Sequence, residues 1–193
     1  LGDDTANIIE GGLGNDVLDG RDGTDTASYA SAASGVKVSL ALTAAQNTVG
    51  AGYDTIAGFE NLRGSKLADT LTGDAGNNVL TGGLGLDILT GGLGSDTFDY
   101  AALTEKGDRI TDFQSGIDIL QLHAAGFSGS TAGIVKYASG STPLSGSGGG
   151  WLLYDTDDGR LYYDTDGNGS SIRQLLTTLD GHPALAATDI MIV

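Results

Sequence analysis

Apolar residues recur every ninth position in two stretches of the chain, residues 2–28 and 64–99. In both, each nine-residue unit begins with Gly, carries Asp or Asn at position six, and ends in three residues whose middle member is apolar or small. These middle residues, at position eight, are Ile9, Leu18, Ala27, Leu71, Leu80, Leu89 and Phe98. Because side chains alternate along a strand, each unit predicts a short strand with its middle side chain inward. Successive units are expected to coil as a parallel solenoid.

The six residues ahead of each predicted strand are rich in Gly and Asp. Gly tolerates positive φ, and Asn and Asp tolerate it next best, so these residues predict tight turns. One buried side chain for every nine ordered residues is a small apolar contribution against the backbone entropy lost. The solenoid is therefore expected to need an added ligand.

Charge indicates what that ligand is. The 193 residues have a formal net charge of −16, and 22 of the 25 acidic residues are Asp. Stacked turns bring carboxylates together, and like charges a few ångströms apart repel unless a cation lies between them. Calcium accepts six to eight oxygens from carboxylates and backbone carbonyls, whereas magnesium demands a stricter octahedron. Softer metals prefer His or Cys, and the chain has only two His and no Cys.

The same composition excludes several classes of protein. A chain this acidic would repel a nucleic-acid backbone. Without Cys it has no disulfide, thiolate zinc site or cysteine nucleophile. No stretch approaches the roughly 18 apolar residues of a transmembrane segment.

The nine-residue units resemble the Gly-Gly-x-Gly-x-Asp-x-apolar-x repeat of the RTX (repeats-in-toxin) family, as in Gly11-Gly-Leu-Gly-Asn-Asp-Val-Leu-Asp19. Seven such units occur in phase, in blocks of three and four. The resemblance implies an all-β fold, a right-handed parallel β-roll followed by a β-strand-rich C-terminal cap. It also implies that two repeats form one turn of the roll, with calcium between loops two repeats apart.

In this family the earlier loop gives the carbonyls of positions two and four, the later loop those of one and three, and both give the position-six side chain. The resemblance thus implies about five calcium ions, with ligands from seven repeats and a closing segment. One site joins Ser65, Leu67 and Asp69 to Gly82, Leu84 and Asp87. A second joins Asp74, Gly76 and Asn78 to Gly91, Leu93 and Asp96. A third joins Asp3, Thr5 and Asn7 to Gly20, Asp22 and Asp25. Gly12, Gly14 and Asp16 are candidates without an obvious partner one turn on, and the turn glycines Gly83, Gly85, Gly92 and Gly94 belong to the same loops. Asp108 and Asp112 are expected ligands in a segment that resembles the block closing such arrays. Asn7 and Asn78 carry no charge, so weaker sites are expected there.

The spacer at residues 29–63 interrupts the period but stays strand-like. We expect one continuous roll over residues 1–122, comprising the arrays, this spacer with a bulging loop at 41–52, and a closing segment at 100–122. The alternative for residues 29–63 is an unstructured linker. Residues 123–193 are expected to form the β-rich cap.

Within the cap, residues 151–155 and 160–164 flank Asp157-Asp158-Gly159, which predicts a hairpin. Residues 164–169 copy the opening of an EF-hand loop, but the twelfth position is Leu175 rather than Glu. A plain acidic turn is favoured there over an extra calcium site.

The chain ends Asp189-Ile-Met-Ile-Val193, which resembles the uncleaved C-terminal signal of RTX proteins exported by type I ABC transporters. The alternative for this ending is a last β-strand. No N-terminal signal peptide is evident, and the chain begins without Met inside a repeat, so we expect part of a longer, secreted, extracellular protein.

Catalytic motifs are not found in the sequence. His123 and His182 stand apart, so no zincin pair exists, and no Gly-x-Ser-x-Gly elbow occurs. The favoured function is a non-catalytic calcium-binding module that folds outside the cell and supports type I export. The alternative is a calcium-stabilised adhesin, surface-layer or polysaccharide-binding module, with Trp151, Tyr154, Tyr162 and Tyr163 as an exposed sugar platform.

Overall fold

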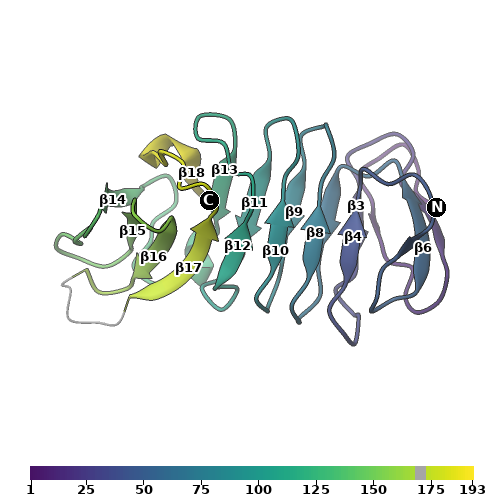
Figure 1. Ribbon diagram of the computed structural model, residues 1–193, viewed down its shortest axis with the longest axis horizontal. Helices are drawn as coiled ribbons and strands as arrows, with labels where there is room; N and C mark the ends of the chain where they lie inside the picture. Colours follow the sequence, from purple (N-terminus) through teal and green to yellow (C-terminus); the bar gives the residue numbers. More distant parts are fainter. Residues whose placement is uncertain (168–172) are drawn as a thin grey trace.

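Short parallel strands lie side by side along the length of the molecule in the computed structural model, which describes residues 1–167 and 173–193 (Figure 1). The first sheet contains, in spatial order, β1 (Ile8–Ile9), β3 (Thr26–Ser28), β7 (Asn61–Arg63), β9 (Val79–Thr81), β11 (Thr97–Tyr100), β13 (Ile119–Leu122) and β18 (Ile190–Ile192). Every neighbouring pair in it is parallel. Its strands come from the repeats, the spacer, the closing segment and the last residues of the chain.

The second sheet begins with parallel strands and ends in a mixed segment. Its order is β4 (Lys37–Ser39), β8 (Thr70–Thr72), β10 (Ile88–Thr90), β12 (Asp108–Ile110), β17 (Gln174–Leu179), β16 (Arg160–Asp164), β15 (Trp151–Asp155) and β14 (Lys136–Gly140). From β4 to β17 the pairs are parallel, and β17, β16 and β15 pair antiparallel. The β15–β16 pair confirms the predicted hairpin.

Consecutive strands from β7 to β13 alternate between the two sheets. Strand neighbours within a sheet are therefore two repeats apart, as in the pairing of Leu80 with Leu62 and of Leu89 with Leu71. One turn of the coil thus takes two repeats, which confirms the expected all-β parallel roll.

Position eight of each repeat forms the core between the sheets. On the first sheet, Leu62, Leu80, Phe98 and Leu120 are partners in register and are essentially buried. On the second, Leu71, Leu89 and Ile110 form the matching column. The flanking residues of each strand are more exposed, as the period of two requires.

Residues 29–63 contain β4, β7, β5 (Gln46–Asn47) and β6 (Tyr53–Ala57), so an unstructured linker was the wrong alternative. Strand β7 continues the first sheet between β3 and β9. Strand β6 lies in a small third sheet, parallel to β2 (Val17–Asp19) and antiparallel to β5. The Gln46 side chain bridges β5 to β4, because its amide accepts from Ser39 N–H (2.8 Å) and donates to Ser39 O (2.9 Å).

Two strands from the C-terminal region close the coil. Strand β17 pairs with β12 and β18 with β13, so each sheet continues into residues 174–192. Two short 3₁₀ turns, Ala124–Gly126 and Ala187–Asp189, lie beside this end. The boundary at residues 122 and 123 stays a prediction. In the described part of the chain no helix is long and apolar enough to span a bilayer.

Shortening a position-eight side chain tests the core. Leu80→Ala removes a fully buried side chain between Leu62 and Phe98, so the free energy of unfolding should fall by about 2–5 kcal/mol. Leu13→Ala is the matched control, since Leu13 is 81% exposed, and should change it by less than about 0.5 kcal/mol. Urea unfolding followed by circular dichroism in calcium measures both. Equal losses in the two variants would contradict the assignment of the core.

Candidate metal centre

Position-six side chains form hydrogen-bonded columns where the turns stack. The backbone N–H of Asp69 donates to Asp87 Oδ1 (2.8 Å), and the N–H of Asp87 donates to Asp108 Oδ1 (3.0 Å). Beside the other sheet, Asn78 N–H donates to Asp96 Oδ1 (2.8 Å) and Asp96 N–H donates to Asp118 Oδ1 (3.0 Å). Each turn is thus tied to the next through one carboxylate oxygen.

These columns are buried. The carboxylate-bearing members Asp25, Asp69, Asp87, Asp96, Asp108 and Asp118 are each at most 3% exposed. Ionised carboxylates in such a place are costly unless they are paired, hydrogen-bonded or bound to a metal. The charge of the columns is therefore the dominant electrostatic feature of the roll.

The side-chain oxygen of the position-six residue lies against the first glycine of its own repeat. A Cβ built at Gly82 would lie 2.4 Å from Asp87 Oδ2, and one at Gly91 would lie 2.3 Å from Asp96 Oδ2. In all seven repeats this distance is 2.2–2.8 Å, which no real Cβ could keep. The first residue of the repeat must be Gly because the position-six side chain takes the space of a Cβ.

Turns two repeats apart lie close against each other. A Cβ at Gly83 (φ +92°) would lie 2.3 Å from Ser65 O, and one at Gly85 (φ +142°) would lie 2.8 Å from Leu67 O. The repeat at Gly64 lacks glycines at positions two and four, but Ser65 Oγ accepts the N–H of Leu67 (3.0 Å) and replaces them as the turn former. Both kinds of turn leave backbone oxygens beside the columns.

Several oxygens in these turns have no partner within the protein. Oδ2 of Asp16, of Asp25 and of Asp87 is buried and accepts no hydrogen bond. A buried acceptor left unpaired costs free energy, and a carboxylate oxygen costs more than a neutral one. Among the described residues no three His, Cys, Asp or Glu side chains converge, so a bound ion would also need carbonyl oxygens. Mixed carboxylate and carbonyl oxygens are what calcium accepts, and the donor set fits it.

Comparison with known families agrees with this donor set. The model of the RTX calcium-binding nonapeptide repeat matches residues 1–29 and 63–98, in four copies. The two arrays are RTX calcium-binding repeats.

The chain is also similar to solved structures. The solution structure of the AlgE6R3 subunit from the Azotobacter vinelandii mannuronan C5-epimerase is 22% identical to this chain. The match covers 99% of this chain and 80% of that one, at a TM-score of 0.36. At that TM-score the similarity supports no conclusion about ligand or activity. No curated protein sequence matches the chain significantly.

The turns that contain the proposed ligands lie against each other in both RTX arrays. In the second array a Cβ at Gly92 would lie 2.0 Å from Asp74 O, and one at Gly94 would lie 2.5 Å from Gly76 O. In the first array, Asn7 N–H donates to Asp25 Oδ1 (2.7 Å), and Thr5 O lies 2.8 Å from a Cβ built at Gly23. The ligand assignments themselves stay a prediction.

Asp108 and Asp112 of the closing segment make different contacts. Asp108 continues the column of Asp69 and Asp87. Asp112 instead accepts the N–H groups of Gly91 and Gly92, both at 2.9 Å, through its two oxygens. Asp112 therefore holds the start of the turn in the repeat at residues 91–99, where Gly91 is a candidate ligand.

Sequence reasoning missed three members of the columns: Asp54, Glu60 and Asp118. Asp54 accepts the N–H of Asp16 (3.0 Å), and Glu60 accepts that of Asp25 (2.8 Å). All three carry a signal, since Gly52-Tyr-Asp54-Thr-Ile56, Gly58-Phe-Glu60-Asn-Leu62 and Gly116-Ile-Asp118-Ile-Leu120 keep the spacing of positions four, six and eight. In the second of these segments Glu takes the place of Asp.

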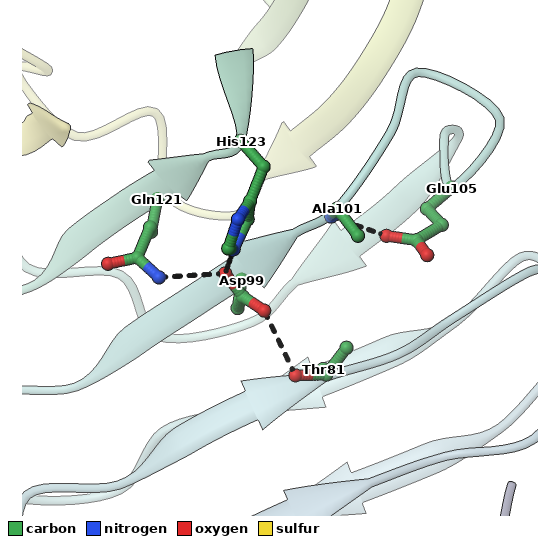
Figure 2. A network of polar contacts seen from close by, with 6 residues as sticks. All are labelled: Thr81, Asp99, Ala101, Glu105, Gln121 and His123. Atoms are coloured by element: carbon green, nitrogen blue, oxygen red, sulfur yellow. Dashed lines mark hydrogen bonds and ion pairs between the residues drawn. The ribbon is translucent and has the colours of Figure 1, made fainter. Parts of the chain in front are cut away.

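Asp99, at position nine, has a different environment. Figure 2 shows its carboxylate on the first sheet, facing Thr81, Gln121 and His123. Oδ1 lies 2.9 Å from Gln121 Nε2 and 2.9 Å from His123 Nε2, and Oδ2 accepts from Thr81 Oγ1 (3.4 Å). Asp99 therefore lies outside the columns, and its carboxylate is held by side chains of the first sheet and by His123.

Two expectations for the C-terminal region concern side chains. The proposed sugar platform is wrong, since Tyr154 and Tyr163 are fully buried in the core of the cap. Of the EF-hand-like segment 164–169, Asp164 is buried and its Oδ1 accepts the N–H groups of Asp166 (3.1 Å) and Gly167 (3.0 Å). Residues 168 and 169 lie outside the described residues.

The final residues form strand β18, with Ile190 and Ile192 buried against β13. This is the conformation that the alternative of a last β-strand predicted. Asp189 is also buried, and its carboxylate accepts from Ser115 Oγ (2.7 Å) and Gly116 N–H (3.0 Å). Whether residues 189–193 also act as an export signal stays a prediction.

Burial shifts the ionisation of the columns. It raises the pKa of Asp87 and of Asp96 to about 6, and that of Asp108 to about 7, with repulsion from neighbouring carboxylates adding to each shift. The ordinary value is 3.8. Without a cation, the folded roll thus favours protonated columns.

The pH dependence of the calcium-free chain follows from these pKa shifts. A carboxyl whose folded pKa is raised stabilises the fold below its unfolded pKa, and this stability is lost as the pH rises through the folded pKa. In EDTA the chain should therefore be more stable at pH 5 than at pH 8, with the loss centred between about 6 and 7. Far-UV circular dichroism in EDTA, recorded from pH 5 to pH 8, measures the folded fraction.

Asp108→Asn should flatten that profile, because Asn can still accept the N–H of Asp87 but does not titrate. Asp157→Asn is the control, since Asp157 is exposed and lies outside the columns. A wild-type folded fraction that rises from pH 5 to pH 8 in EDTA would contradict the assigned shifts.

Proposed function

We propose that this chain is a non-catalytic RTX module of a secreted bacterial protein, which folds when it binds calcium outside the cell. The observation that carries the proposal is the set of buried carboxylate oxygens of Asp16, Asp25 and Asp87 without a partner in the protein. All three residues belong to repeats of a calcium-binding type, and both Asp25 Oδ2 and the carbonyl of Gly58 approach a Cβ built at Gly20.

Without calcium, the columns oppose folding. The chain has a formal net charge of −16, and its turns place ionisable groups in register at the same edge of the sheets. Self-repulsion of this kind favours extended chains. An extended chain suits passage through a type I exporter, which is the export route we propose.

When calcium binds, it supplies positive charge and accepts the free oxygens. In the second array, the carboxylates of Asp69, Asp87 and Asp96 would hold it together with carbonyls of the same turns. An ion present at 100 times its dissociation constant stabilises the folded state by about 2.7 kcal/mol per site. Several such sites would favour the folded roll outside the cell, where calcium is abundant.

Calcium titration of the wild-type chain tests the proposal. Far-UV circular dichroism at pH 7.5 should show a largely unfolded chain in EDTA and β-structure in millimolar calcium, and magnesium at equal ionic strength should not replace it. Equal spectra in EDTA and calcium would overturn the proposal.

Asp87→Asn refines this test at one ligand. Asn keeps the acceptor for the N–H of Asp69 but replaces the unpartnered Oδ2 by an amide group, so the calcium midpoint should rise several-fold. Asp157→Asn also removes one charge, from an exposed side chain, and should leave the midpoint unchanged. A common shift in both variants would indicate net charge rather than ligation.

A further inference from the structure

The spacer contains a turn that lies against the second repeat of the first array. Gly14 N–H donates to Ala51 O (2.7 Å), and Tyr53 N–H donates to Asn15 Oδ1 (2.9 Å). A Cβ at Gly52 (φ +130°) would lie 1.9 Å from Gly14 O. The turn at residues 50–54 therefore lies against the turn at 12–16 as one RTX loop lies against another.

The match extends into the strands that follow. Asp16 N–H donates to Asp54 Oδ1 (3.0 Å), the bond that ties position-six residues within the arrays. Next, β2 pairs in parallel with β6, which places Leu18 beside Ile56, both buried. Gly52, Asp54 and Ile56 thus occupy positions four, six and eight of a repeat, although the RTX match stops at residue 29 and resumes at 63.

This pair of turns also holds an unpartnered oxygen. Asp16 Oδ2 is buried and accepts no hydrogen bond. The same is true of Asp25 Oδ2 and Asp87 Oδ2. Asp54 is 1% exposed, and its Oδ2 accepts from Tyr29 Oη (3.2 Å) and Thr48 Oγ1 (3.3 Å). Two carboxylates therefore meet here, one of them with an oxygen left free.

We infer that a calcium ion binds between these two turns, held by the carboxylates of Asp16 and Asp54 together with the carbonyl of Gly14. The inference rests on the proposed function, and it assigns a partner to the second repeat. Asp16 and Asp54 are 38 residues apart, whereas position-six partners within an array are 18 apart. An ion there would fasten the intervening spacer to the roll.

Counting bound calcium tests the inference. The wild-type chain is dialysed at the lowest free calcium concentration that saturates it, and calcium per chain is measured by elemental analysis. Asp54→Asn and Asp16→Asn should each lower the count by one. The double variant should also lose one ion rather than two, since both side chains serve the same site.

Two controls separate ligand loss from misfolding. Tyr29→Phe removes a donor to Asp54 but no proposed ligand, and Asp157→Asn removes a charge elsewhere, so both should keep the wild-type count. Circular dichroism at saturating calcium should show the same β-content in every variant.

Other outcomes are decisive in the opposite direction. A wild-type count in Asp54→Asn, a loss of two ions in the double variant, or a loss in Tyr29→Phe equal to that in Asp54→Asn would overturn the spacer site. If the wild-type chain itself bound no calcium, the proposed function would fail instead.

Discussion

The burial of carboxylates in columns between stacked turns is the constraint on which the rest of this structure depends. The backbone N–H of Asp69 donates to the carboxylate of Asp87, and that of Asp87 donates to the carboxylate of Asp108. All three side chains are almost fully buried. This arrangement fixes the first residue of every repeat as Gly, because the position-six oxygen lies where a Cβ would be. In the function that we propose, it also makes the folded state depend on a cation, since hydrogen bonds satisfy only some of the carboxylate oxygens.

The sheets are arranged so that these columns can form. Two repeats per turn place position-six residues 18 apart in register, and the apolar residues at position eight pack between the sheets in the same register. The core is narrow, with one position-eight side chain from each repeat, so its apolar contribution per ordered residue is small. The strands β17 and β18 continue both sheets beyond the last repeat, and the buried side chains of the cap add apolar contacts that the repeats lack.

Much of this could be predicted from the sequence because the repeat encodes it locally. Gly, Asp and an apolar residue at fixed positions specify the turn, the column and the core, and Leu80 or Asp87 could be placed correctly by counting in nines. The environments of Asp54 and Glu60 could not be placed in this way, because they depend on where the spacer re-enters the coil, and that is decided by pairing across 35 or more residues. The burial of Tyr154 and Tyr163 was missed for a similar reason: an alternating strand leaves open which face is covered until its neighbours are known.

The most direct test of this account is the radius of gyration at pH 7.5, measured by small-angle X-ray scattering with and without calcium. For a chain of this length the expected values are about 47 Å when unfolded and about 16 Å when compact. The account predicts a value near the first in EDTA and a fall toward the second as calcium is added, with no such fall in magnesium. A compact chain in EDTA, with dimensions unchanged by calcium, would contradict the claim that the carboxylate columns require a cation to close.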